Sequence, residues 1–182
     1  MSWKNTEHRY GSLSIGLHWL MLVLIAVVYF TMEFRGLFPK GTDGRELMKQ
    51  THFMLGLSIF ALVWVRLIAR LIAPTPIIVP AIPAWQAIPA KLMHLALYAL
   101  MIGTPLLGWL ILSAFGKPIP FFGLELPALI APDHDFGEQL EHWHVRLADA
   151  GYWLIGLHAV AGLFHHYISR DNTLTRMLPG RN

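Results

Sequence analysis

The sequence predicts an all-α membrane protein, built as a four-helix transmembrane bundle. Four separate apolar segments are each about twenty residues long, which is enough to cross a ~30 Å hydrocarbon core. Hydrophobic residues make up 55 % of the 182 residues, and charged residues make up only 14 %. A water-soluble domain of this length could not bury so much apolar surface. We therefore expect one integral membrane domain over residues 1–182, with no second domain.

The expected spans follow one another along the chain. They cover about residues 13–34, 52–73, 92–115 and 143–168. The first span is too long for the apolar core of a signal peptide and lacks a small-residue cleavage site, so we expect it to be retained. Pro105 falls inside the third span, and we expect it to kink or thin that helix.

The connectors between the spans differ in composition. The first is polar and punctuated by glycine. The second contains five prolines, and we expect it to form a stiff, extended strap. The third is aromatic in its first half and acidic in its second half. We expect this third connector to lie along the membrane surface and to cover a site beneath it.

The basic residues favour cytoplasmic termini by a small margin. An even number of spans places both termini on one side of the membrane. Eight Lys and Arg residues fall on that side and six on the other. The positive-inside rule then assigns the termini to the cytoplasm. The eight are Lys4, Arg9, Arg66, Arg70, Lys91, Arg170, Arg176 and Arg181, and the six are Arg35, Lys40, Arg45, Lys49, Lys117 and Arg146.

Four histidines lie at matching depths inside the apolar spans. His18 is in the first span, His52 opens the second, and His144 and His158 are in the fourth. A polar ring in hydrocarbon is costly unless it is satisfied, so such residues suggest a function. Because His144 and His158 are close to four helical turns apart, or roughly 21 Å of rise, they share one helix face. This is the layout of a helix that carries one axial ligand for each of two stacked haems.

The absence of cysteine narrows the possible cofactors. The sequence contains no cysteine, which excludes iron–sulfur clusters, thiolate-ligated haem, zinc–thiolate sites, disulfides and the covalent attachment of c-type haem. Any haem must therefore be a non-covalent b type held by histidine.

Membrane depth then suggests how the ligands pair. We expect His52 and His144 to bind an outer haem, and His18 and His158 to bind an inner haem. Exchanging the two membrane faces would not change this pairing. The third helix would supply no ligand in this arrangement.

Other histidines have two interpretations each. His94 is either a boundary residue of the third helix or a rival ligand. His142 lies two residues from His144, and we prefer His144 because it shares the face of His158. His165 and His166 should lie near the cytoplasmic boundary. They would take part in quinone binding or proton transfer, or would only contact lipid headgroups.

Several segments of the sequence resemble bacterial cytochrome b561 proteins. The resemblance is carried by SIGLHWLMLVLIAVVYFTMEFRGLFPK, THFMLGLSIFALVWVRLIARL, the strap with its PTP motif and the GLHA…FHHY…DNTL…RM ending. It implies four transmembrane helices, two b haems held by four histidines, and electron transfer with ubiquinone in the bacterial inner membrane. The implied ligand positions match His18, His52, His144 and His158. The members closest in pattern are superoxide oxidases, which oxidise superoxide at the periplasmic face and reduce ubiquinone.

Basic residues on the expected outer side suit an anionic donor such as superoxide. A cationic funnel raises the association rate of a small anion. The alternative is that these charges only pair with Glu33, Asp43, Glu46, the acidic third connector or haem propionates. The residues expected to steer the anion are Arg35, Arg45, Lys49 and Lys117.

Two other functions are compatible with the sequence. One is an electron-transfer subunit that relays electrons between a hydrogenase or dehydrogenase partner and quinone. The other is a histidine-lined metal transporter. The transporter is disfavoured because Asp149 is the only acidic residue near the middle of a span. We expect no nucleic-acid partner.

Overall fold

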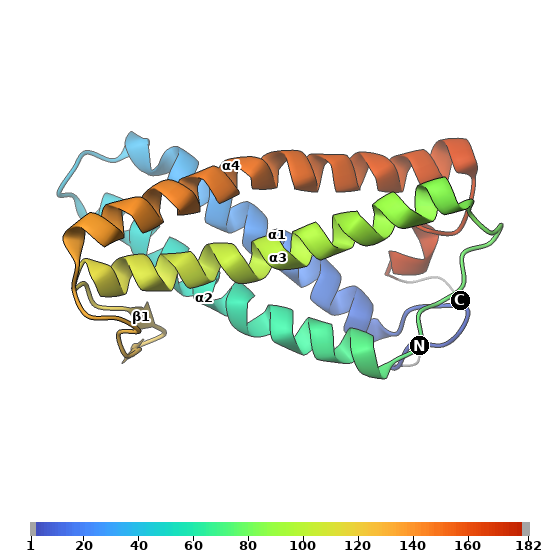
Figure 1. Cartoon of the computed structure of the whole chain (residues 1–182), viewed down its shortest axis with the longest axis horizontal. Coiled ribbons are helices and arrows are strands. Elements are labelled where there is room, and N and C mark those ends of the chain that lie inside the picture. The colour runs from blue at the N-terminus through green and yellow to red at the C-terminus, as the bar shows by residue number, and fades with distance from the viewer. Residues whose placement is uncertain (1–2, 180–182) are drawn as a thin grey trace. The chain divides into compact units, whose positions relative to one another are not determined.

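Four long helices dominate the computed structural model, which describes residues 3–179 (Figure 1). They are α1 (Ser12–Phe34), α2 (Asp43–Ile72), α3 (Ala84–Ala114) and α4 (His134–Phe164). Within the described residues, each of the four is long and apolar enough to cross a membrane. The all-α membrane fold class predicted from the sequence is therefore confirmed.

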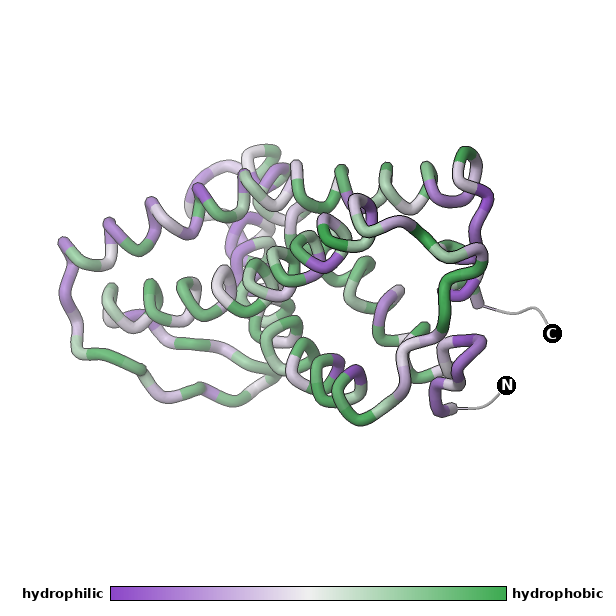
Figure 2. The backbone as a smooth tube through the Cα atoms, turned by 45° about the vertical axis from the view of Figure 1, so that its right-hand side comes forward, coloured by the Kyte–Doolittle hydropathy of each residue, from purple (hydrophilic) through white to green (hydrophobic). Residues whose placement is uncertain are grey.

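The helices expose the apolar surface that a lipid-facing protein requires. Ile72, Trp153 and Leu71 are 81 %, 76 % and 75 % exposed. Figure 2 shows hydrophobic residues along all four helices, and the segments that connect them mix hydrophobic and hydrophilic residues. In water such large exposed apolar faces would drive association, so their extent indicates that lipid covers them.

Three helices begin earlier than the spans expected from the sequence, and two of them, α2 and α4, do so with a polar first turn. α2 begins at Asp43 rather than near residue 52, and α4 begins at His134 rather than near residue 143. The expectation was based on apolar runs, but a helix can continue into water when its first turn is stabilised. Asp43 lies in the first turn of α2, where a negative charge is favourable. Asp133 accepts a hydrogen bond from the Phe136 amide at 3.0 Å and so caps α4.

The proline strap is shorter than expected, because α3 begins at Ala84 rather than near residue 92. The amides of Gln86 and Ala87 donate to the Pro83 carbonyl, which starts the helix. Pro89 therefore lies inside α3 as its sixth residue, where its missing N–H leaves the Trp85 carbonyl without an i+4 donor.

A short hairpin lies in the connector between α3 and α4. Strands β1 (Pro120–Phe121) and β2 (Leu124–Glu125) pair antiparallel around a two-residue turn. Phe122 and Gly123 have φ of 48° and 85°, as tight hairpin turns require. Next to the hairpin, Ile119 packs against Leu57 of α2 and Leu112 of α3.

The chain forms two compact units. Unit 1 contains the described residues up to Leu20, Val63–Leu100 and the described residues from Asp149 on. Unit 2 contains Met21–Leu62 and Met101–Ala148. Each long helix contributes one segment to each unit. A single membrane domain stays a prediction.

In unit 1, the segments next to both termini meet the strap. The Ile77 amide donates to the Glu7 carbonyl at 2.8 Å, and the Asn172 amide donates to the Val79 carbonyl at 3.1 Å. In Figure 1 these N-terminal, strap and C-terminal segments are dark blue, green and red. Both terminal segments therefore lie at the same end of unit 1, as an even number of spans requires.

Candidate functional site

In unit 2, the rings of His52 from α2 and His144 from α4 face each other. Their centroids are 6.1 Å apart and their planes make an angle of 67°. Nδ1 of His52 lies 3.2 Å from the Val28 carbonyl, and Nδ1 of His144 lies 2.9 Å from the Thr104 carbonyl. A carbonyl only accepts, so each Nδ1 carries the proton and each Nε2 keeps its lone pair. Both rings are therefore in the tautomer that binds a metal through Nε2.

The space around this pair is largely apolar. A Cβ at Gly56 would meet no atom within 4 Å, and one at Gly108 would lie 3.5 Å from Cε1 of His144. These glycines leave room on α2 and α3 beside the two rings. The cavity is lined by His52, Phe53, Gly56, Leu57, Pro105, Gly108, Trp109, Leu112 and His144.

The distance between the His52 and His144 rings fits one bound iron atom. An iron bound to two imidazole nitrogens at about 2.0 Å each holds the ring centroids roughly 6.3 Å apart. The observed separation is 6.1 Å. The donor set and its spacing thus fit a bis-histidine haem.

A second histidine cluster lies in unit 1. The His158 centroid is 6.2 Å from that of His18 and 5.6 Å from that of His94. The His18–His158 distance matches the separation estimated for two imidazole rings bound to one iron, whereas the His94–His158 distance is shorter. Nδ1 of His94 donates to the Ala90 carbonyl at 2.7 Å, so its Nε2 is also available. His94, the rival ligand considered above, therefore contacts His158.

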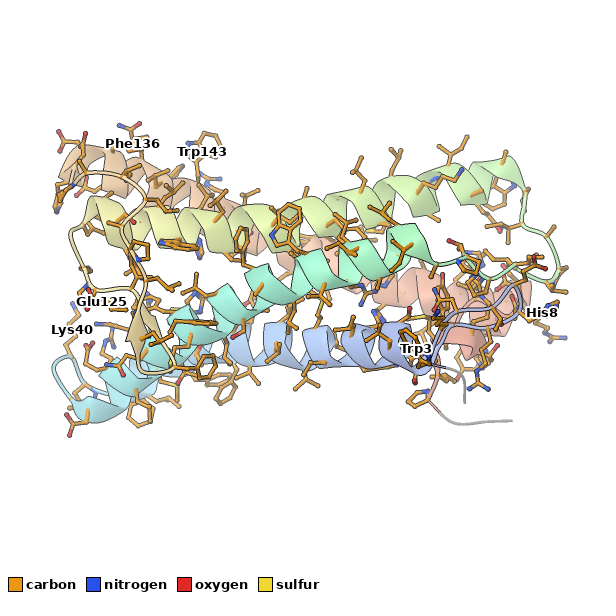
Figure 3. All side chains as sticks on the ribbon, turned by 90° about the horizontal axis from the view of Figure 1, so that it is seen from below. Trp3, His8, Lys40, Glu125, Phe136 and Trp143 are labelled. Atoms are coloured by element: carbon orange, nitrogen blue, oxygen red, sulfur yellow. The ribbon has the colours of Figure 1, made fainter. Side chains whose placement is uncertain are left out.

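The structure brings together the same histidines that the depth argument paired. Their role as ligands stays a prediction. His142, the neighbour that the sequence disfavoured, is exposed on α4 together with Trp143. Figure 3 shows Phe136 and Trp143 projecting outward from α4.

His165 is part of a buried polar pair. Its Nδ1 lies 2.5 Å from Oδ2 of Asp171, whose residue exposure is 5 %. Burial by itself would raise the pKa of Asp171, but hydrogen bonds from Thr173 and His165 hold that pKa below its usual value. His165 begins a π-helical turn, His165–Ser169, and such turns are frequent at functional sites. The ring of His166 packs instead against Tyr167, at 4.7 Å.

The basic residues expected to steer an anion all lie in unit 2, and most have local partners. Nη1 of Arg45 donates to the carbonyls of Arg35 and Phe38, and Nζ of Lys49 lies 2.7 Å from Glu46. Lys117 and Phe115 form a cation–π contact at 4.8 Å. Among these contacts, only the Glu46 carboxylate offsets a positive charge, and Arg45 and Lys117 keep theirs. Steering by Arg35, Arg45, Lys49 and Lys117 stays a prediction.

Lys40 is a further basic residue of the connector between α1 and α2. It is exposed, and Figure 3 shows it at the tip of that connector.

Sequence reasoning missed the groups that orient the histidines. The acceptors at Val28 and Thr104 are main-chain carbonyls, which leave no side-chain signature. Nη2 of Arg66 lies 3.0 Å from Nδ1 of His18, although the sequence indicated only that Arg66 lies near the end of its span. Asp171 stood within the DNTL motif, where no spacing rule linked it to His165.

Comparison with known proteins decides the family. A sequence model of prokaryotic cytochrome b561 matches residues 9–180. The chain belongs to the prokaryotic cytochrome b561 family. It is 41 % identical to cytochrome b561 homolog 1 of Escherichia coli K12 over 174 residues, covering 96 % of this chain and 99 % of that protein.

Two other relatives match over most of their length. The chain is 38 % identical to the probable superoxide oxidase CybB of Yersinia pestis over 171 residues, covering 94 % of this chain and 96 % of that protein. It is 34 % identical to cytochrome b561 homolog 2 of E. coli K12 over 186 residues, covering 98 % and 95 %.

Family membership and the four apolar helices together define the general role of the chain. It is a multi-pass membrane protein of the bacterial inner membrane, and it takes part in membrane electron transfer. Membership also implies a b-type haem.

Proposed function

We propose that this chain takes electrons from superoxide at the periplasmic face of the inner membrane and gives them to ubiquinone near the cytoplasmic face. The observation that carries the proposal is the presence of two histidine pairs whose rings are 6.1 and 6.2 Å apart. The name of the Yersinia pestis relative, a probable superoxide oxidase, supports superoxide as the donor. Two b-type haems, when bound, would supply the one-electron chemistry.

His52 and His144 would hold the outer haem. Their Nδ1 atoms donate to the Val28 and Thr104 carbonyls, so both Nε2 atoms keep a lone pair for iron. A haem held by both histidines would supply electron transfer rather than oxygen binding. A donor would therefore react by contact at the edge of the site.

His18 and His158 would hold the inner haem, because their ring separation matches two Fe–N bonds better than that of His94 and His158. The contact with Arg66 leaves the proton of a neutral His18 ring on Nε2, so binding iron through Nε2 would require this contact to change or the ring to lose that proton. The Arg66 guanidinium lies against His18 and places a permanent positive charge beside this pair. A fixed cation stabilises an added electron on a nearby group.

Superoxide would be attracted by the basic residues of unit 2. Arg35, Lys49 and Lys117 carry positive charge near the segments that supply His52. Electrostatic attraction of a small anion raises its association rate by about 10- to 1,000-fold when the field is focused on the site. Arg45 contributes charge as well, but its two hydrogen bonds to carbonyls also stabilise the connector.

Ubiquinone would bind in unit 1 beside His165 and His166. Trp19 lies next to His18, with ring centroids 5.4 Å apart, and Tyr167 packs against His166. The aromatic rings provide an apolar wall, and the histidines provide donors for a quinone carbonyl. This end of the chain also lies at the membrane boundary, where protons are available from water.

The test uses purified full-length protein in detergent or nanodiscs. Reduced-minus-oxidised visible spectra and a haem assay should give two b-type haems per chain. A superoxide source should then reduce the haems and drive reduction of added ubiquinone, and superoxide dismutase should abolish both reactions. Haem reduction by an unrelated dehydrogenase but not by superoxide would favour the relay subunit considered above.

A further inference from the structure

We propose that Asp171 is a positioning residue for ubiquinone reduction, holding His165 so that its Nε2–H points to a quinone carbonyl. The inference rests on the proposed function and extends it to a residue outside the expected site. It assigns His165 and His166 different roles, with proton donation carried by His165.

The geometry of the pair supports this assignment. Oδ2 of Asp171 accepts from Nδ1 of His165 at 2.5 Å, and Oδ1 accepts from the Thr173 amide at 2.8 Å. Both carboxylate oxygens are therefore fixed, and the His165 ring cannot rotate without losing its hydrogen bond. Since Asp171 uses Nδ1, the nitrogen left for a substrate is Nε2. Because the carboxylate keeps a proton on Nδ1, Nε2 carries a second proton only in the imidazolium form of the ring, and this is the form that would donate to the quinone.

The backbone around the pair is shaped to bring the two residues together. The π-helical turn His165–Ser169 ends at Arg170, which has a left-handed conformation with φ of 53°. The Asp171 amide then donates back to the His165 carbonyl at 3.1 Å. This reversal places Asp171 beside the side chain of His165 rather than further along the helix. A regular helix would not bring residues 165 and 171 onto the same face.

The positive charge of Arg176 also stabilises the ionised form of Asp171. Arg176 is buried, lies over the ring of Tyr10 at 5.6 Å and donates to the Pro76 carbonyl. Burial lowers the pKa of Arg176, and the nearby Tyr10 and Asp171 act against this effect. A buried carboxylate with a cation and two donors nearby stays ionised, as an acceptor for His165 must.

The proposed step balances as a two-electron, two-proton reduction. Two superoxide anions each lose one electron and become O2, and one quinone gains two electrons and two protons and becomes quinol. The Nε2–H bond of the His165 imidazolium would break as an O–H bond forms on the quinone, leaving a neutral ring that keeps its Nδ1–H and its hydrogen bond to Asp171. Water at the membrane boundary returns the proton to Nε2, and the second proton follows the same route.

The decisive experiment compares His165→Ala, Asp171→Asn and the double variant in superoxide-driven ubiquinone-1 reduction, with haem content and spectra recorded for each. We expect Asp171→Asn to keep both haems and their reduction by superoxide. We expect it to lower kcat for quinone about tenfold, with KM unchanged, because the donor is misoriented rather than the pocket altered. The double variant should be no slower than His165→Ala, because Asp171 acts only through His165.

Asn172→Ala is the matched control. Asn172 ties the same segment to Ile77 and Val79 but does not contact His165. If Asn172→Ala lowers kcat as much as Asp171→Asn, the role of Asp171 is structural and the inference is wrong. The same conclusion follows if the double variant His165→Ala/Asp171→Asn is slower than His165→Ala, so that the losses from the two substitutions add. Normal turnover in Asp171→Asn with slow turnover in His165→Ala would overturn the role of Asp171 but leave the proposed quinone site in place. Normal turnover in His165→Ala would instead reject the proposed quinone site.

Discussion

Nη2 of Arg66 donates to Nδ1 of His18 across 3.0 Å. This contact is the reverse of the one made by His52, whose Nδ1 donates to a carbonyl. The histidines of unit 2 are thus held by neutral acceptors, whereas the His18–His158 pair lies beside a permanent cation. The two proposed haem sites therefore differ in electrostatics although their ring spacings are nearly equal.

The first prediction follows from this charge. Replacing Arg66 with Gln should lower the midpoint potential of the inner haem by tens of millivolts, because the positive charge that stabilises the added electron is lost. The outer haem should keep its potential. Spectroscopic redox titration resolves the two centres and checks this. An unchanged or higher inner potential would show that Arg66 does not act on this site.

The second prediction concerns the ligands. Substituting Ala for His52 or His144 should remove the outer haem, and substituting Ala for His18 or His158 should remove the inner one, so that each variant retains one haem. The physical reason is that loss of one axial nitrogen removes half of the protein–iron bonds. Haem-to-protein ratios and low-temperature spectra measure the loss.

His94→Ala is the informative control for the inner pair. It should keep both haems, because the 5.6 Å between the rings of His94 and His158 is shorter than bis-histidine ligation requires. Loss of a haem in this variant, with retention in His18→Ala, would make His94 the partner of His158.

The third prediction concerns attraction of the donor. The rate of haem reduction by superoxide should fall about tenfold as ionic strength rises from about 0.01 to about 1 M, because salt screens the attraction. Lys49→Gln and Lys117→Gln should slow reduction at low salt and leave the haem spectrum unchanged. Stopped-flow absorbance measures the rate.

The control for this series is Lys91→Gln, an exposed lysine of unit 1. It should leave the rate unchanged. Arg45 is less suitable for the test because its hydrogen bonds to Arg35 and Phe38 hold the connector. A rate that is independent of salt would leave the steering proposal without support.

The fourth prediction places quinone reduction in unit 1. The double variant His165→Ala/His166→Ala should keep both haems and their reduction by superoxide, yet deliver electrons to ubiquinone at least tenfold more slowly, because a general acid is lost. Stopped-flow reduction followed by a quinone-turnover assay separates the two steps. Undiminished turnover would place the acceptor site elsewhere, most simply beside the outer haem.

Four membrane-length helices could be predicted because apolar runs of that length seldom occur outside transmembrane helices. The starts of α2 and α4 were placed too late, since their polar first turns carry no hydropathy signal. Those turns are specified by capping groups such as Asp133, and capping is a local effect that a search for apolar runs does not detect.

Only those parts of the candidate site that depend on the type and spacing of side chains could be predicted. The pairing of His52 with His144 could be inferred from depth alone, because helices fix height along the membrane normal. The short distance between His94 and His158 could not, since it depends on how each helix is rotated about its axis. The hydrogen bond between His165 and Asp171 could not be predicted either, because it depends on a π-helical turn for which the sequence has no recognisable pattern.

The main-chain acceptors at Val28 and Thr104 have a consequence for variation at these two positions. Every amino acid has a carbonyl, so replacing either side chain leaves the hydrogen-bond acceptor in place. A deep mutational scan would score both positions as tolerant to any residue that keeps the helix, even though each orients a histidine. What the two rings depend on is the register of α1 and α3, so a one-residue insertion upstream in either helix should be far more damaging than any single substitution there.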